Sequence, residues 1–229
     1  MILKRFDLDS IPAILWGEPS DRLYIYVHGK MSRKEAAEPF ARLAEQKGFQ
    51  TLSFDLPQHG ERRDSAILDI LTGIRDLNAA ADYAFARRKH VSLFACSLGA
   101  YFSLQAYADL PLEKALFQSP VVDMAFLTNR MMEWFSVTPD ELSARGVVDT
   151  PIHPLRWGDY RYILDHPVKR WLIPTDILYG GLDTMQTLEV MQSFAERFGA
   201  RLTVSAGSEH PFMAPSDRKI AEAWLERTV

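Results

Sequence analysis

A serine, an aspartate and a histidine in this chain could together perform nucleophilic catalysis. Ser97, Asp183 and His210 occur in this order along the chain, and each lies at the end of a segment with the pattern of a β-strand. A serine hydroxyl becomes a nucleophile when a histidine accepts its proton, and a carboxylate orients that histidine and stabilises its charged form. We therefore expect Ser97 to attack a carbonyl carbon, with His210 as the base and Asp183 as its partner.

The residues around Ser97 indicate a sharp change of chain direction. In Ala95-Cys96-Ser97-Leu98-Gly99, small residues stand two positions before and two positions after the serine. A tight turn from a strand into a helix requires small residues there, but an ordinary helix N-cap shows the same pattern. Taken alone, the segment leaves both interpretations open. We expect the Cys96 side chain to point away from the site, into the core.

Alternating strand and helix patterns predict the elements that position these residues. The predicted strands are 22–29, 49–57, 90–97, 113–120, 175–183 and 201–210. Apolar residues at spacings of three and four predict helices over 33–48, 64–89 and 187–199. Apolar strands joined by amphipathic helices indicate an α/β fold, with a mostly parallel sheet covered on both faces. Residues 1–20 fit one or two antiparallel edge strands.

Residues 121–174 interrupt this alternation. They show no convincing strand, yet carry seven aromatic residues and three methionines, with helical patterns around 122–135, 139–145 and near 158–165. A connection of this length is normally a functional insertion. We expect a helical lid here, after the strand ending near Pro120, within one domain spanning 1–229. Its aromatic residues would pack the lid, form a subunit interface or line a substrate pocket, for which the candidates are Phe126, Trp134 and Phe135.

Five segments together resemble the α/β-hydrolase family, and the likeness covers nearly the whole chain. They are YVHGK (26–30), FDLPQHGER (54–62), ACSLG (95–99), YGGLD (179–183) and SEHPF (208–212). The family's serine motif is Gly-x-Ser-x-Gly, so Ala95 departs from it. The turn is expected to crowd the residues two before and two after the serine against each other, and alanine still meets that need for small bulk.

The resemblance implies a role for each matching position. Ser97 would lie on the strained turn that presents the nucleophile, and the backbone N–H groups of Leu98 and Lys30 would form the oxyanion hole. Met31 is the alternative to Lys30 as second donor. Asp123, at the end of the strand before the lid, is a second candidate for the acid, although the YGGLD segment favours Asp183.

The implied activity is hydrolysis of a small to medium ester, or a related acyl substrate, through an acyl-enzyme and without a cofactor. The same three residues could also cleave a peptide, an amide or a carbon–carbon bond, and a non-catalytic binding protein is the remaining alternative. His28 and His59 are expected to shape loops. The Lys30 ammonium is either solvated or, if it lies over the site, favours an acyl group bearing a negative charge.

Composition limits the other classes of function. The chain has 229 residues and a formal net charge of -4, with no dense cluster of lysine and arginine, so a nucleic-acid partner is not expected. No apolar run is long enough for a membrane span, and the single cysteine cannot form an intramolecular disulfide. No metal-ligand spacing or glycine-rich phosphate loop occurs. We expect a cytoplasmic protein, either a monomer or a homodimer, that acts on a small molecule.

Overall fold

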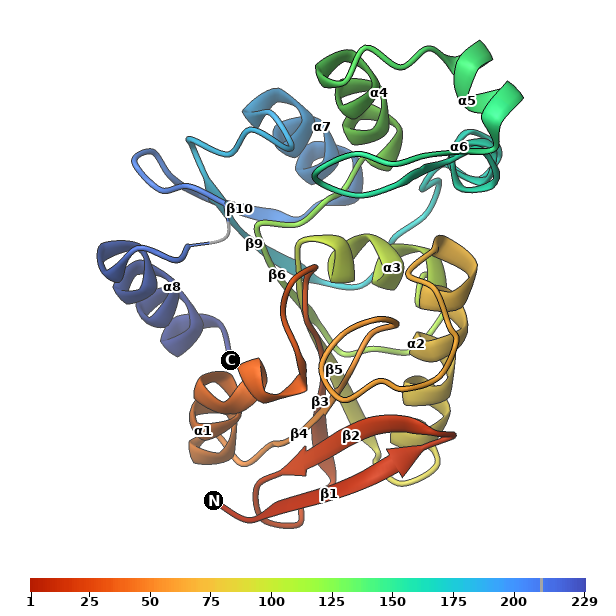
Figure 1. Cartoon of the computed structure of the whole chain (residues 1–229). Helices are drawn as coiled ribbons and strands as arrows, with labels where there is room; N and C mark the ends of the chain where they lie inside the picture. The colour runs from red at the N-terminus through yellow and green to blue at the C-terminus, as the bar shows by residue number, and fades with distance from the viewer. Residues whose placement is uncertain (211) are drawn as a thin grey trace.

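An eight-stranded sheet crosses the centre of the computed structural model, which describes residues 1–210 and 212–229 (Figure 1). The strand order is β1-β2-β4-β3-β5-β6-β9-β10. The strands are β1 (Leu3–Leu8), β2 (Ile11–Trp16), β3 (Arg22–Val27), β4 (Gln50–Phe54), β5 (His90–Cys96), β6 (Ala115–Gln118), β9 (Thr175–Gly180) and β10 (Arg201–Ser205). From β4 to β10 neighbouring strands are parallel, whereas β1 pairs antiparallel with β2, and β2 with β4. The predicted sheet is confirmed.

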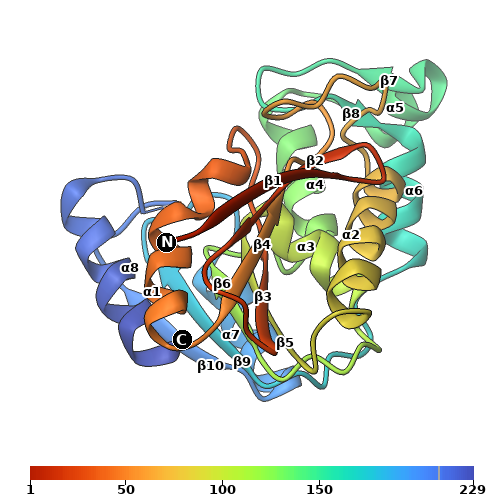
Figure 2. The same cartoon turned by 90° about the horizontal axis from the view of Figure 1, so that it is seen from below.

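Helices cover both faces of this sheet (Figure 2). On one face lie α1 (Glu38–Gln46) and α8 (Pro215–Thr228), and on the other lie α2 (Ile70–Phe85), α3 (Leu98–Ala106) and α7 (Leu188–Phe198). The strands are therefore apolar on both sides. In β3, Leu23 and Ile25 pack in one core, while Tyr24 meets the ring of Phe40 in the other, with centroids 5.1 Å apart.

The helices differ from the sequence prediction mainly at their ends. The helix predicted over 64–89 begins only at Ile70, because the Asp69 carboxylate accepts the N–H of Thr72 at 2.8 Å and caps the first turn. The helix predicted over 33–48 is a 3₁₀ helix, η1 (Lys34–Ala37), followed by α1. Helix α7 ends before Gly199, which adopts a left-handed conformation with φ 67°.

The segment from residue 121 to residue 174 lies between β6 and β9 and gathers at one end of the molecule (Figure 1). Its helices are α4 (Met124–Trp134), α5 (Pro139–Arg145) and α6 (Trp157–Asp165), close to the predicted ranges. The expectation that it contains no strand is wrong, since β7 (Val147–Val148) pairs antiparallel with β8 (Leu155–Arg156). Two-residue strands are too short to show an alternating pattern. Among the described residues, no helix is long and apolar enough to cross a membrane.

Candidate active site

Ser97 occupies a strained turn between β5 and α3. Its φ of 50° and ψ of -120° lie outside the regions that side-chain-bearing residues normally adopt. The turn is held by backbone hydrogen bonds, because the N–H of Ser97 donates to the carbonyl of Gln118 and its own carbonyl accepts the N–H of Val121. The Ser97 side chain makes no capping hydrogen bond to α3. The turn therefore presents the hydroxyl, and the helix-cap interpretation is excluded.

Close packing of the turn explains its glycines. A Cβ placed on Gly99 would lie 2.5 Å from the carbonyl oxygen of His28 and 2.8 Å from that of Val27. A Cβ on Gly29 would lie 3.0 Å from the Cβ of Ser97. The loop after β3 thus runs directly against the serine turn, which brings the backbone of that loop beside the Ser97 hydroxyl.

The hydroxyl, the histidine and the aspartate form a continuous hydrogen-bonded chain. Ser97 Oγ lies 2.9 Å from His210 Nε2, and His210 Nδ1 lies 2.7 Å from Asp183 Oδ2. A carboxylate only accepts, so Nδ1 carries the proton and, in the neutral ring, Nε2 accepts from the hydroxyl. Asp183 Oδ1 also accepts the N–H of Met185 at 2.7 Å, which fixes the carboxylate plane. This arrangement can transfer the hydroxyl proton to the imidazole.

Asp123, the second candidate for the acid, has a different role in the structure. Its Oδ1 accepts the N–H of Phe126 at 2.8 Å, so it caps the first turn of α4. Its backbone is held by Gln186, whose side-chain oxygen accepts the N–H of Asp123 and whose amide donates to the Asp123 carbonyl. Asp183, and not Asp123, is the carboxylate beside His210.

Two loops hold Asp183 and His210 together. The N–H of Leu182 donates to the carbonyl of Ser208 at 3.0 Å. A Cβ on Gly180 would lie only 2.6 Å from that same carbonyl oxygen, so glycine permits the approach. Asp217 of α8, for which the sequence predicts no role, accepts the Ser208 hydroxyl at 3.1 Å and so anchors the loop that carries His210. A carboxylate in the first turn of a helix carries no signal of such a long-range contact.

The loop after β3, residues 28–31, is shaped by two histidines. His28 Nδ1 donates to the carbonyl of Gly29 at 2.7 Å, and its Nε2 accepts the N–H of Leu56 at 3.1 Å. Burial lowers the pKa of His28 to about 4, so the ring is neutral near pH 7. His59 Nε2 accepts the N–H of Met31 at 3.0 Å. Both histidines therefore have the structural role predicted for them.

These contacts bear on the candidate oxyanion donors. The N–H of Met31 points to His59, so the expectation that Met31 replaces Lys30 is not supported. Within the described residues, no acceptor takes the backbone N–H of Lys30 or of Leu98, the first residue of α3. Both residues line a cavity together with Ser97. Two unused N–H groups next to a nucleophile are suited to bind an oxygen that becomes negatively charged.

A buried ion pair between Lys34 and Asp55 holds the chain that follows the loop after β3. Lys34 Nζ lies 2.7 Å from Asp55 Oδ2, and both side chains are almost fully buried. Asp55 also accepts the backbone N–H groups of Lys34 and Glu61, each at 2.8 Å. The aspartate therefore ties the chain after β3 to the chain after β4. Asp55 belongs to the segment 54–62 that resembles the family, whereas the position of Lys34 in the sequence gives no sign of its burial.

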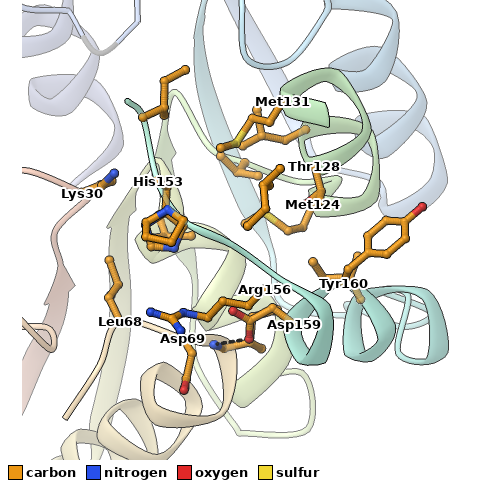
Figure 3. Close-up of a pocket in the computed structure, with 18 of the residues that line it drawn as sticks. Lys30, Leu68, Asp69, Met124, Thr128, Met131, His153, Arg156, Asp159 and Tyr160 are labelled. Atoms are coloured by element: carbon orange, nitrogen blue, oxygen red, sulfur yellow. Dashed lines mark hydrogen bonds between the residues drawn. The ribbon is translucent and has the colours of Figure 1, made fainter. Parts of the chain in front are cut away.

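A cavity of about 870 Å³, including its open mouth, adjoins Ser97 (Figure 3). Its wall is mostly apolar, and α4 contributes Met124, Leu127, Thr128, Met131 and Trp134. Of the three predicted pocket residues, Trp134 therefore lines it. Phe126 lines a separate groove between α4, α6 and α7, and Phe135 lines neither. The lining positions recur at spacings of three and four, so Phe126 falls on another side of the helix.

Cys96 does not take part in the site. Its side chain packs against the core on the face that carries Phe94 and Tyr26, as expected from its position in the strand. Burial, together with the negative charge of the nearby Asp183 carboxylate, raises the pKa of the Cys96 thiol to about 12. The thiol is therefore neither ionised nor directed at the cavity.

Comparison with known proteins identifies the fold. No protein-family model and no curated protein sequence matches the chain. An alpha/beta hydrolase domain-containing protein from mouse matches in structure with a TM-score of 0.77 over 100% of this chain and 98% of that one, at 13% identity. The chain has the α/β-hydrolase fold.

Other proteins with the α/β-hydrolase fold are similar over nearly their whole length. Est1E from Butyrivibrio proteoclasticus, solved with ferulic acid bound, matches with a TM-score of 0.83 and 18% identity, covering 98% of this chain and 97% of that one. An esterase of Pyrococcus furiosus matches with a TM-score of 0.72 and 19% identity, covering 99% and 88% respectively. At these identities the likeness extends to the fold alone.

Proposed function

We propose that this protein is a serine hydrolase that cleaves small to medium carboxylic esters, or related acyl substrates, through an acyl-enzyme. The observation that carries the proposal is the chain of hydrogen bonds from Ser97 through His210 to Asp183. Ser97 lies on a strained turn and lines a cavity. The similarity in fold to an esterase supports hydrolysis of an ester substrate. Apart from water, the reaction needs only groups that the chain itself supplies.

In the first half-reaction Ser97 Oγ forms a bond to the carbonyl carbon of the substrate, and its proton moves to His210 Nε2. The carbonyl π-electrons move to the oxygen, which accepts the N–H groups of Leu98 and Lys30. Each such donor typically lowers the barrier by about 3–4 kcal/mol. The carbonyl then re-forms, the carbon–oxygen bond to the leaving group breaks, and the alkoxide takes the proton from His210.

In the second half-reaction water attacks the acyl-enzyme and gives its proton to His210 Nε2. The new tetrahedral intermediate uses the same two N–H donors. When it collapses, Ser97 Oγ leaves, recovers the proton, and the carboxylic acid is released. Asp183 holds the imidazole orientation throughout and stabilises the imidazolium formed in each half.

The segment 121–174 is proposed to act as a lid over the site. Its helices α4 and α6 provide much of the wall of the cavity that Ser97 also lines, including Met131 and Tyr160. An apolar wall of this kind binds the hydrocarbon part of an acyl substrate and excludes water from the acyl-enzyme.

A fluorophosphonate probe tests the proposal directly. We expect the probe to modify one serine per chain, identified by mass spectrometry as Ser97, and we expect hydrolysis of p-nitrophenyl acetate and butyrate. Ser97→Ala should abolish both. Ser103→Ala is the matched control, because Ser103 is a buried serine of α3 whose hydroxyl donates to the carbonyl of Gly99. Modification of a different serine, or undiminished turnover by Ser97→Ala, would refute the assignment.

A further inference from the structure

Two cationic side chains that line the Ser97 cavity form no ion pair with any of the described residues. Arg156, at the end of β8, has a buried Nε that makes no hydrogen bond to the part of the chain that the structure describes. Among the described residues, no ion pair or hydrogen bond engages the Lys30 ammonium either, although the side chain is partly buried and burial lowers its pKa. In Figure 3, Lys30 and His153 lie to the left of Met124 and Met131, and Arg156 lies below them, toward Asp69 and Asp159. A buried, unpaired guanidinium N–H is costly unless a ligand pairs with it.

The two carboxylates that line the same cavity are already engaged. Asp69 Oδ1 accepts the N–H of Thr72 at 2.8 Å, and Asp159 Oδ1 accepts the N–H of Ile70 at 3.2 Å. Both therefore serve the N-terminus of α2, where the helix dipole also favours negative charge. Asp159 attracts Arg156 electrostatically, but no ion pair joins the two. The remaining histidine, His153, is neutral near pH 7 because burial lowers its pKa to about 4.

The position of the cavity indicates which half of a substrate enters it. Ser97 and the two residues that carry the proposed oxyanion donors, Leu98 and Lys30, line the cavity, whereas His210 is not among its lining residues. The leaving group receives its proton from the histidine, so it departs on the side of His210. The acyl group, which stays bonded to Ser97, then extends into the cavity.

We propose that the acyl group of the substrate carries an anionic end, a carboxylate in the simplest case, and that Arg156 binds it. The guanidinium presents Nε and an Nη as parallel donors, which match the two oxygens of a carboxylate. The Lys30 ammonium, which lines the same cavity, adds electrostatic attraction, and the methionine and leucine side chains of α4 contact the hydrocarbon part. Arg156 is thus a specificity-determining residue of the proposed hydrolase, and this inference rests on that function.

The kinetic test uses two esters that differ only in the charged end: monoethyl adipate and ethyl hexanoate. We expect the wild-type protein to favour the monoethyl adipate in kcat/KM. Arg156→Met should lower the ratio of kcat/KM for monoethyl adipate to kcat/KM for ethyl hexanoate by about tenfold or more. The loss should appear mainly as a higher KM for monoethyl adipate, because a charged hydrogen-bond donor is lost from binding. Lys30→Met should lower the ratio by a smaller factor. Arg161→Met is the matched control, since Arg161 is exposed on α6 and lies outside the cavity lining.

Binding to Ser97→Ala tests the inference independently of catalysis. By calorimetry, we expect Ser97→Ala to bind monoethyl adipate at least about tenfold more tightly than neutral diethyl adipate. In the double variant Ser97→Ala/Arg156→Met, we expect the two affinities to be equal. That result supports the charged acyl group even if the wild-type protein hydrolyses no ester, in which case only the proposed function fails. Hydrolysis of ethyl hexanoate with no preference for monoethyl adipate, or a preference unaltered by Arg156→Met, overturns the inference and leaves the hydrolase assignment intact.

Discussion

Gly99→Ala should damage the active site more than it damages the fold. The added Cβ would lie 2.5 Å from the carbonyl oxygen of His28, 2.8 Å from that of Val27 and 2.9 Å from Val27 Cγ1. Two of these three atoms belong to the backbone, so no rotamer change relieves the contact. Either the loop after β3 or the turn at Ser97 must move.

The size of the effect follows from that contact. A Cβ needs about 3.4 Å or more from an oxygen, so one of the two segments must shift by close to 1 Å. Overpacking of a well-packed region costs about 1–3 kcal/mol of unfolding free energy. A displacement of about 1 Å between a nucleophile and its donors costs about 100-fold in rate. We therefore expect Gly99→Ala to fold, to lose about 1–3 kcal/mol, and to lose about two orders of magnitude in kcat/KM.

Urea unfolding and hydrolysis of p-nitrophenyl butyrate measure the two effects separately. Gly158→Ala provides the matched control, because nothing lies within 4 Å of a Cβ on Gly158, in the first turn of α6. That variant should gain about 0.4–1 kcal/mol from the reduced entropy of the unfolded chain and keep its activity. A Gly99→Ala protein with activity within twofold of wild type would show that the contact between the two segments does not position the site.

Three further predictions concern the acid, the pH dependence and the pocket. Asp183→Asn should lower kcat by about 10⁴-fold in the ester assay, because an amide no longer holds the correct imidazole tautomer, whereas Asp123→Asn should affect mainly stability, by at most about 1–2 kcal/mol. Burial holds the pKa of His28 at about 4, below the ~6.5 of an unfolded chain, so the unfolded state binds this proton first as the pH falls. Urea unfolding should therefore show about 2 kcal/mol less stability from this group at pH 5 than at pH 7.5. Trp134→Ala should raise the ratio of kcat/KM for esters with long acyl chains to kcat/KM for esters with short acyl chains by about tenfold, because the substitution widens the cavity.

A specific result would contradict each of these three predictions. Equal losses of kcat in the two aspartate variants would remove Asp183 from the proposed mechanism. A free energy of unfolding that does not change between pH 7.5 and pH 5 would mean that His28 is protonated as readily in the folded protein as in the unfolded one. An unchanged chain-length profile in Trp134→Ala, with probe labelling intact, would place the acyl group elsewhere.

The sequence predicts the sheet well because both of its faces are buried. Strands such as β5 are apolar along their centre, and apolar strands that alternate with amphipathic helices are compatible with few folds other than a parallel sheet covered on both faces. The serine turn is predictable for a similar reason, since its small residues are contiguous. The order in which Asp183 and His210 follow their strands is also visible, because residues at the carboxyl ends of parallel strands converge on one edge.

What the sequence does not predict depends on contacts between distant elements. The rotation of α4 about its axis decides that Met131 and Trp134 face the cavity while Phe126 does not, and that rotation is set by packing against α6. Arg156 becomes a cavity residue only through the short β7–β8 ladder, for which the sequence shows no alternation. Side chains that gain their role from such packing carry no local pattern.

The departure at Ala95 from the glycine of the family motif has an explanation in the same packing. The structure shows the close contacts of Gly99 to be with Val27 and His28, at the end of β3. Ala95 instead lies fully buried in the core, opposite Val27 in the register of β3 and β5. The requirement for glycine therefore falls on Gly99 and Gly29, where the loop after β3 meets the serine turn, and the position of Ala95 accommodates a methyl group.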